Sequence, residues 1–196
     1  MPDPVAIDYR KLYDAFVTVL ERELGRKEES VIHAIMGFEF GGPPDLLLFR
    51  NAPGVKGTFY VTSDLLFFDR QPKNSLGRYE LAICLPKESV WAEHVLFKLS
   101  QATVEEVFDV GHTADISAWL DPSCSIKGLL FTRLVSFDFE GLAFGALLCV
   151  GVTRDELEFA LKNGSEAVIK RLKAAGIFPV TDIERTSVIC EGPTGR

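Results

Sequence analysis

The hydrophobic and polar positions of this chain follow two periods, one helical and one typical of strands. Apolar residues recur every three or four positions from Tyr9 to Leu20, which is the spacing of an amphipathic helix. Asp8 can cap this helix and Gly25 can end it, so we predict a helix over residues 8–24. Several later segments alternate with a period of two, as half-buried strands do.

Strand patterns dominate the middle of the chain. The first half contains four of them in succession with no helical pattern between them, at 31–39, 46–50, 57–63 and 79–85. Successive strands without intervening helices favour antiparallel pairing. Two further strands are predicted over 127–134 and 144–152, and a final one within 178–180 or 186–190.

The second half of the chain adds helices. A helical pattern covers 89–100, and capping-box sequences at 103–106 and 153–156 predict a short helix and a helix that ends near Lys162. Ser165 is the predicted cap of a last helix that ends near Gly176, and 109–125 is predicted as a loop. The order of these elements lacks a regular β-α-β alternation. It therefore predicts an α+β fold with a mostly antiparallel or mixed central sheet flanked by helices.

A chain of 196 residues fits one domain and can bury a core without a metal or a disulfide. We predict a single domain over 1–196, with its core at about 32–188, the N-terminal helix at 8–24 and a frayed tail at 191–196. No apolar stretch reaches the ~20 residues that cross a bilayer, and the N-terminus lacks the features of a signal peptide. A cytoplasmic protein that does not enter membranes is expected.

The cysteines and glycines carry no cofactor motif. Cys84, Cys124, Cys149 and Cys190 are far apart and form no C-x-x-C pair, so buried free thiols are predicted and no metal site is expected. Neither a phosphate-binding loop nor a dinucleotide-binding glycine pattern is present. We therefore expect no cofactor.

Negative charge is concentrated in one part of the chain. Residues 99–160 contain ten acidic and three basic residues, which equals the net charge of −7 of the whole chain. Two interpretations stay open, a solvated acidic face and a surface that attracts a basic partner. Nucleic acid is not an expected partner, because phosphate binding needs patches of Lys and Arg.

Candidate catalytic groups are sparse. No nucleophile-elbow sequence is present. His33 and His94 lie in strand and helix patterns and are interpreted as structural, whereas His112 lies in the acidic loop and is the histidine with the best case for a role. Asp138 and Glu140 form an acidic pair, for which exposure to solvent is favoured over acid–base chemistry.

Several stretches of the chain, taken in order, resemble the Suppressor of fused domain in its bacterial form. They are Gly41–Asn51, Tyr60–Ser63, Arg78–Pro86, Trp91–Ala92, Gly111–His112, Gly151–Leu157 and Val180–Arg185. The resemblance extends from about 32 to 188, and it is to the N-terminal lobe of the two-lobed animal protein.

The resemblance implies a protein-binding module with no enzymatic activity. The animal member represses signalling by clamping a short extended peptide of a transcription factor between its two lobes. Bacterial members have been proposed as immunity proteins that neutralise toxins. The expected partner is accordingly a protein, and more specifically a basic toxin or another basic effector.

The resemblance also indicates where a partner would bind. Part of the animal peptide site is a Gly-Asp-His stretch, which corresponds to residues 108–112, although Gly111 stands where the acid before the histidine is expected. The same peptide is therefore not expected to bind. The candidate partner-binding residues are Phe108, Asp109, Gly111, His112, Asp115, Asp138 and Glu140.

Two alternatives to a binding module stay open. One is an enzyme in which His112 forms a site with Asp109, Asp115 or Asp138, and it requires a concave pocket that holds these groups. The other is a structural homodimer, which would expose an apolar patch on the monomer.

Overall fold

The computed structural model describes residues 7–50 and 52–189. The helices are α1 (Tyr9–Leu24), α2 (Val90–Ala102), α3 (Arg154–Asn163) and α4 (Ser165–Ala174), and the strands are β1 (Val31–Ile32), β2 (Leu46–Phe49), β3 (Thr58–Thr62), β4 (Arg78–Leu85), β5 (Thr113–Asp115), β6 (Gly128–Phe139) and β7 (Leu142–Val152). The predicted tail 191–196 and Cys190 lie outside the described residues, and the single domain over 1–196 stays a prediction.

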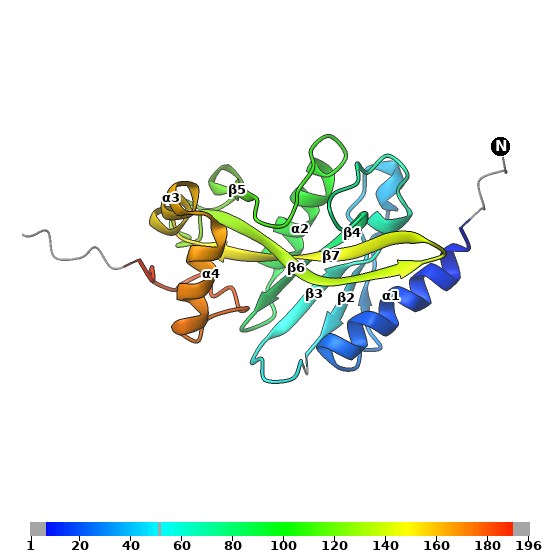
Figure 1. Ribbon diagram of the computed structural model, residues 1–196, viewed down its shortest axis with the longest axis horizontal. Helices are drawn as coiled ribbons and strands as arrows, with labels where there is room; N and C mark the ends of the chain where they lie inside the picture. Colours follow the sequence, from blue (N-terminus) through cyan, green and yellow to red (C-terminus); the bar gives the residue numbers. More distant parts are fainter. Residues whose placement is uncertain (1–6, 51, 190–196) are drawn as a thin grey trace, which may run out of the picture.

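The strands form one seven-stranded sheet in the order β1-β2-β3-β4-β7-β6-β5 (Figure 1). Neighbouring strands are antiparallel throughout, except that β4 and β7 are parallel. The chain leaves β4, adds α2, β5 and β6, and then returns to β4 through β7. The predicted α+β fold with a mixed sheet flanked by helices is confirmed.

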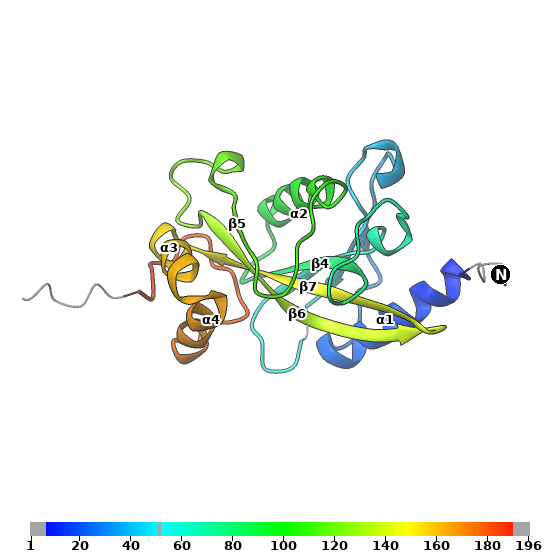
Figure 2. The same ribbon diagram turned by 45° about the horizontal axis from the view of Figure 1, so that its top comes forward.

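Helices cover both faces of the sheet (Figure 2). α1, α3 and α4 pack on one face, with Leu12, Phe16 and Leu172 among the buried side chains, and α2 packs on the other through Val95 and Leu99. Because both faces are covered, the central strands β2, β3 and β4 are almost continuously buried rather than alternating between core and solvent.

The N-terminal helix is confirmed. The Asp8 carboxylate accepts a hydrogen bond from the backbone N–H of Lys11, which caps α1, and Gly25 ends it by donating its N–H to the carbonyl of Glu21. Leu12, Phe16 and Leu20 of the predicting stripe are buried against the sheet, whereas Tyr9 at its start is exposed.

The predicted strand over 31–39 is wrong beyond its first two residues. The Asp45 carboxylate accepts the backbone N–H of Ala34, and the chain then turns into a 3-10 helix over Phe38–Phe40. A side chain has therefore taken the hydrogen bond that a neighbouring strand would have made.

Two predictions in the middle of the chain are also corrected. The capping box at 103–106 starts no helix, because Thr103 ends α2 and donates its hydroxyl to the carbonyl of Ser100. The predicted loop 109–125 contains β5 and a 3-10 helix over Ser117–Trp119. In addition, β6 and β7 extend well beyond the predicted 127–134 and slightly beyond 144–152.

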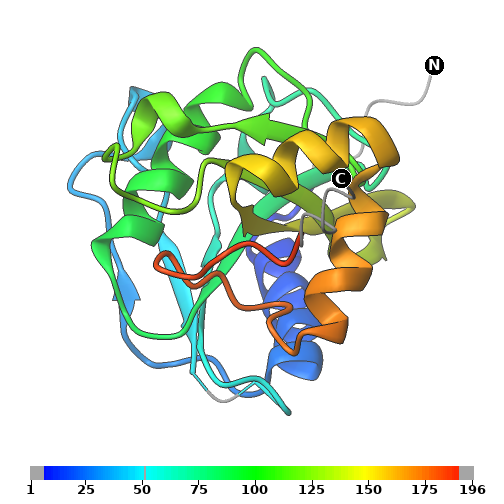
Figure 3. The same ribbon diagram turned by 90° about the vertical axis from the view of Figure 1, so that its left-hand side faces the viewer.

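The C-terminal segment after α4 contains no strand within the described residues, so the predicted strand at 178–180 or 186–190 is wrong there. This segment crosses the end of the sheet (Figure 3), where the Thr181 N–H donates to the carbonyl of Cys84 and its hydroxyl accepts the N–H of Gly151. Ser165 is not the cap of α4, because Gly164 occupies that position.

The three described cysteines are unpaired, and Cys84 and Cys149 are buried as predicted, which raises the pKa of each thiol to about 12. No helix in the described part of the chain combines the length and the apolar character that a membrane span requires.

Candidate protein-binding surface

The candidate loop at 108–112 begins at a buried anchor. The Phe108 ring stacks on Phe131 with 4.8 Å between the centroids, and the Phe108 N–H donates to the hydroxyl of Tyr79 at 3.1 Å. The side-chain amide of Asn74 donates to the Phe108 carbonyl at 2.9 Å. Phe108 therefore holds the loop on the sheet, and its ring is not presented to solvent.

Asp109 fixes the next turn of the loop. Its carboxylate accepts hydrogen bonds from the N–H and the hydroxyl of Ser75 and from the N–H of Val110. Partial burial alone would raise the pKa of Asp109, but these hydrogen bonds outweigh it and the pKa falls below its ordinary value. The carboxylate is thus ionised, and its oxygens already accept hydrogen bonds from Ser75 and Val110.

Gly111 and His112 bring the loop alongside β6. Gly111 has a φ of +88° and donates its N–H to the carbonyl of Phe131, whose own N–H donates to the carbonyl of His112. The Ser165 hydroxyl donates to the Gly111 carbonyl, which ties the loop to the start of α4. The His112 side chain is exposed.

Asp115 links β5 to the start of α3. Its carboxylate lies 2.7 Å from the Arg154 guanidinium and also accepts the N–H and the hydroxyl of Ser117. These contacts, with the hydrogen bond from Arg154 as the strongest, lower the pKa of Asp115 to about 2. The pair is about half exposed, so its charge is partly neutralised and its effect on stability is small.

Replacing Arg154 with glutamine is expected to return the pKa of Asp115 from about 2 toward its ordinary value of 3.8. In wild type, the stabilisation from this depressed pKa is present above pH 3.8 and lost as the pH falls through about 2. Because the pair is exposed, we expect less than ~1 kcal/mol of destabilisation from the substitution. NMR titration of the carboxyl carbons tests the shift. An unchanged Asp115 titration would refute the assignment to Arg154, and Arg171→Gln is the control.

A groove lies beside this loop, at the edge of the sheet. It has a volume of about 360 Å³ and is lined by Gly111, His112, Thr113, Ala160, Leu161, Gly164 and Ser165. The Leu161 side chain is 69% exposed there. β5 is one of the two edge strands of the sheet that the described residues form. The His112 carbonyl accepts the N–H of Phe131 on β6, and the Ile116 N–H donates to the carbonyl of Lys127, which directly precedes β6. Because inward and outward backbone groups alternate along an antiparallel strand, the N–H and C=O of Thr113 point away from β6.

Asp138 and Glu140 lie far from this groove. Asp115 pairs with Gly128 at the start of β6, whereas Asp138 is ten residues further along the same strand and pairs with Ala143. At about 3.3 Å per residue, the two carboxylates are about 30 Å apart. Glu140 occupies the hairpin turn between β6 and β7, with a φ of +50°. The structure thus brings together Phe108, Asp109, Gly111, His112 and Asp115 but not Asp138 or Glu140.

The geometry limits the chemistry of this region. An acid site that combines His112 with Asp138 is ruled out by distance. Asp109 and Asp115 both have lowered pKa values, whereas a carboxyl that acts as a general acid near neutral pH needs a raised one. Among the described residues, no group of three or more His, Cys, Asp or Glu side chains could hold a metal ion.

The other two histidines have hydrogen-bond partners, as expected for structural residues. Nδ1 of His33 lies 2.7 Å from the Asp45 carboxylate, and Nε2 of His94 lies 3.0 Å from the carbonyl of Trp119. Both side chains are exposed, however, so their strand and helix patterns did not predict their environment.

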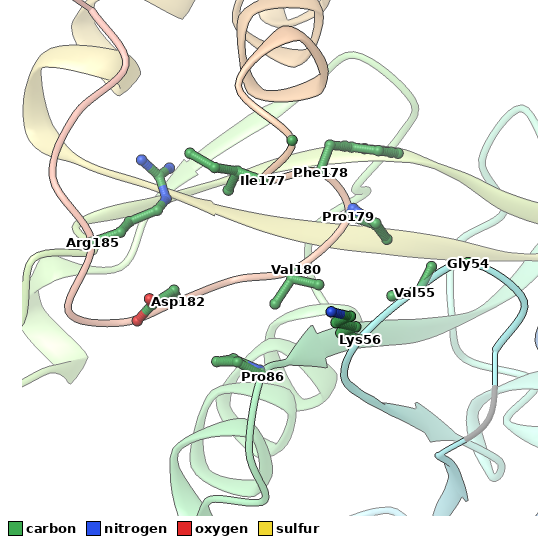
Figure 4. A pocket seen from close by; sticks show the side chains of 11 residues that line it. Gly54, Val55, Lys56, Pro86, Ile177, Phe178, Pro179, Val180, Asp182 and Arg185 are labelled. Carbon is green, nitrogen blue, oxygen red and sulfur yellow. The ribbon is translucent and has the colours of Figure 1, made fainter.

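A second hollow lies under the C-terminal segment and was not predicted from the sequence. It measures about 430 Å³ and is lined by Gly54, Val55, Lys56, Pro86, Gly176, Ile177, Phe178, Pro179, Val180, Asp182 and Arg185. Figure 4 shows that the C-terminal segment forms one side of it and the β2–β3 loop the other. Arg185, one of the lining residues, is held in place by a buried ion pair with Glu156 of α3. This pair joins two of the stretches that carried the family resemblance.

A family model described as Suppressor of fused protein (SUFU) matches residues 43–186. This chain belongs to the Suppressor of fused family. The match includes the whole 108–115 region and the Glu156–Arg185 pair. A search of curated proteins found no match.

Solved structures share the fold. A Sufu–Fu complex crystal structure is 17% identical, with a TM-score of 0.69 over 92% of this chain and 91% of that chain. A protein described as a SUFU homologue from Neisseria gonorrhoeae FA 1090 is 20% identical, with a TM-score of 0.65 over 95% and 100%. Drosophila Suppressor of Fused is 16% identical, with a TM-score of 0.68 over 90% of this chain but only 50% of that chain. This chain therefore spans about half the length of the Drosophila protein.

Proposed function

We propose that this protein is a non-enzymatic protein-binding module, and that a protein partner binds in the groove beside β5. The observation that carries the proposal is the combination of a strand edge that is unpaired among the described residues with a shallow groove that Thr113 of this strand lines together with α3 and α4. An extended segment of a partner can add to such an edge through backbone hydrogen bonds. The solved Sufu–Fu complex supports a binding role, since a relative of this fold is found with a protein partner.

The local structure suits such a contact. Asp109 and Phe108 hold the loop before the partner arrives, so little ordering is needed on binding. The outward N–H and C=O of Thr113 offer a donor and an acceptor, and Leu161 offers apolar surface across the groove. His112 adds an exposed polar side chain to the lining of the groove.

The partner that we propose is basic. Asp115 on β5 and Asp155 and Glu158 on α3 are exposed acidic side chains on the two elements that flank the groove, and acidic side chains of this kind speed capture of an oppositely charged protein. In a bacterial host this protein would be a cytoplasmic immunity protein that neutralises a basic toxin. Asp138 and Glu140 would take no part in the groove contact, because they lie several Debye lengths along β6 from it.

A strand-addition site is expected to fail when the outward donor of β5 is removed. We expect Thr113→Pro to weaken partner capture at least about tenfold, because proline lacks the N–H and blocks the approach of a backbone. Thr113→Ala is the matched control and is expected to retain capture. The measurement is an affinity pull-down at low salt from the lysate of the protein's own host, followed by titration with the purified captured protein.

The outcomes are distinct. A captured basic protein that binds wild type and Thr113→Ala but not Thr113→Pro supports the proposal, provided that circular dichroism shows Thr113→Pro to be folded. Equal capture by both variants would move the site away from β5. An acidic captured protein would contradict the electrostatic part of the proposal.

A further inference from the structure

A second surface feature lies at the opposite edge of the sheet, on the loop between β1 and β2. Ile35 is fully exposed there, Met36 is 52% exposed and Phe40 is 73% exposed. Three large apolar side chains presented by one short loop are unusual for a surface that meets only water. β1 and β5 end the strand order on opposite sides, so about 29 Å of sheet separates this loop from the β5 groove.

This loop is held in one shape. The N–H groups of Gly41 and Gly42 donate to the carbonyls of Phe38 and Gly37, at 2.9 and 3.2 Å, and the Gln101 side chain of α2 donates to the carbonyl of Gly42 at 3.1 Å. A Cβ at Gly42 would lie 1.9 Å from the carbonyl oxygen of Met36, so the chain closes tightly on itself. The apolar side chains are therefore displayed by a preorganised loop.

The same loop forms one wall of an acidic cavity. The cavity measures about 370 Å³ and is lined by Ala34, Gly37, Phe38, Glu39, Asp45, Asp64, Phe67 and Phe68. The described residues of this lining include three carboxylates and three aromatic rings, and none of these residues is basic. The Asp45 carboxylate accepts a hydrogen bond from the N–H of Ala34 and lies 2.7 Å from Nδ1 of His33. One carboxylate oxygen of Asp64 accepts the N–H of Asp45.

Asp64 is the carboxylate of this cavity that is least favoured in its charged form. Burial raises its pKa, the hydrogen bond from the Asp45 N–H opposes this rise, the negative charge of Asp45 adds to it, and His33 opposes it. A half-buried carboxylate of this kind gains from a cation that enters the cavity, because an opposite charge stabilises the ionised form. The aromatic rings of the lining also favour a guanidinium or ammonium group.

We infer that the β1–β2 loop and the adjoining acidic cavity form a second docking surface, which receives an extended segment of a protein partner rich in Arg or Lys and apolar side chains. A basic side chain enters the cavity toward Asp45 and Asp64, and apolar side chains of the segment pack on Ile35 and Phe40. A second copy of this chain is a poor occupant, because its net charge is −7 and it would bring further acids to an acidic cavity.

The test uses two synthetic peptides and the intact protein. ¹⁵N-labelled protein is titrated with the peptide Leu-Arg-Leu-Arg-Leu-Arg-Leu and, separately, with the same peptide carrying Glu in place of Arg. We expect the Arg peptide alone to shift the amide signals of residues 33–45 and 64–68. Binding affinity is then measured by fluorescence anisotropy with a labelled peptide.

Two variants and two matched controls locate the contact. Glu39→Lys and Phe40→Ser are each expected to weaken the Arg peptide at least about fivefold. Glu23→Lys makes the same charge change on α1, and Val90→Ser removes a similarly exposed apolar side chain at the start of α2, so both are expected to retain binding. Leu161→Ser, at the β5 groove, reports whether the peptide binds there instead.

Three results would overturn the inference. The first is no binding of the Arg peptide, or equal binding of the Glu peptide. The second is binding that is lost in Leu161→Ser but kept in Glu39→Lys and Phe40→Ser, which would assign the peptide to the β5 groove and leave the proposed function intact. The third is a wild-type dimer in sedimentation velocity that Phe40→Ser converts to a monomer, which would identify a second copy as the occupant.

Discussion

Replacing Glu156 with alanine is expected to lower the free energy of unfolding by about 3–5 kcal/mol. The Glu156 side chain is 0% exposed and its partner Arg185 is 7% exposed. The two guanidinium nitrogens donate to the two carboxylate oxygens at 2.7 and 2.5 Å, and the same oxygens accept the N–H groups of Val188 and Thr153. Removing the carboxylate leaves a buried guanidinium without its counter-charge.

This pair holds the C-terminal segment on the fold. Because Glu156 also completes the capping box of α3, the substitution weakens the start of that helix as well. Urea unfolding followed by circular dichroism measures the effect. Glu166→Ala is the matched control, since the Glu166–Lys170 pair is largely exposed and we expect it to change stability by less than ~0.5 kcal/mol. Similar losses in both variants would refute the role of the buried pair.

The stability of this protein is expected to fall as the pH rises from 4.5 to about 8, because of Glu80 on β4. This side chain is fully buried, and burial raises its pKa from an ordinary 4.5 to about 8 despite hydrogen bonds from Thr62 and Leu66. Below pH 4.5 the carboxyl is protonated in both the folded and the unfolded states. Between pH 4.5 and about 8 only the unfolded state ionises, so unfolding becomes easier by about 1.4 kcal/mol per pH unit.

Glu80→Gln is expected to remove this pH dependence and to stabilise the protein at pH 8 by several kcal/mol, on the order of 4. The glutamine carbonyl can accept the Leu66 N–H, and its amide can donate to the Thr62 hydroxyl, which also lies within reach of the Leu81 carbonyl. Urea unfolding of wild type and variant from pH 5 to 9 tests this. Parallel stability curves would show that Glu80 is not the titrating group, and a much less stable variant at pH 5 would reveal a misfit of the amide.

The sequence predictions were accurate where no other interaction in the fold used the same residues or backbone groups. The helix at 8–24 was predicted well because its cap, its apolar stripe and its terminal glycine lie within one segment. The strand predicted over 31–39 failed because the Asp45 carboxylate, distant in sequence, takes the N–H of Ala34. The capping box at 103–106 failed because Thr103 was already used to end α2.

The candidate site was predicted in part. The 108–112 stretch was found through the family resemblance, and it does lie at a sheet edge next to a groove. The other walls of that groove include Leu161 of α3 and Ser165 of α4, and no sequence pattern linked either residue to this loop. Asp138 was grouped with this region because of its charge, but β6 is a long strand and carries it to the other end of the molecule.

The sequence by itself determined the class of fold, the positions of the main helices and strands, the family and the concentration of negative charge. These properties depend on period, composition and local order, which a linear chain displays directly. Only the tertiary structure decided that β7 pairs in parallel with β4, that Glu156 meets Arg185, and that Glu39, Asp45 and Asp64 share a cavity. Each of these results joins segments that are separated in sequence, and their proximity is set by how helices and strands pack, for which no single segment carries a signal.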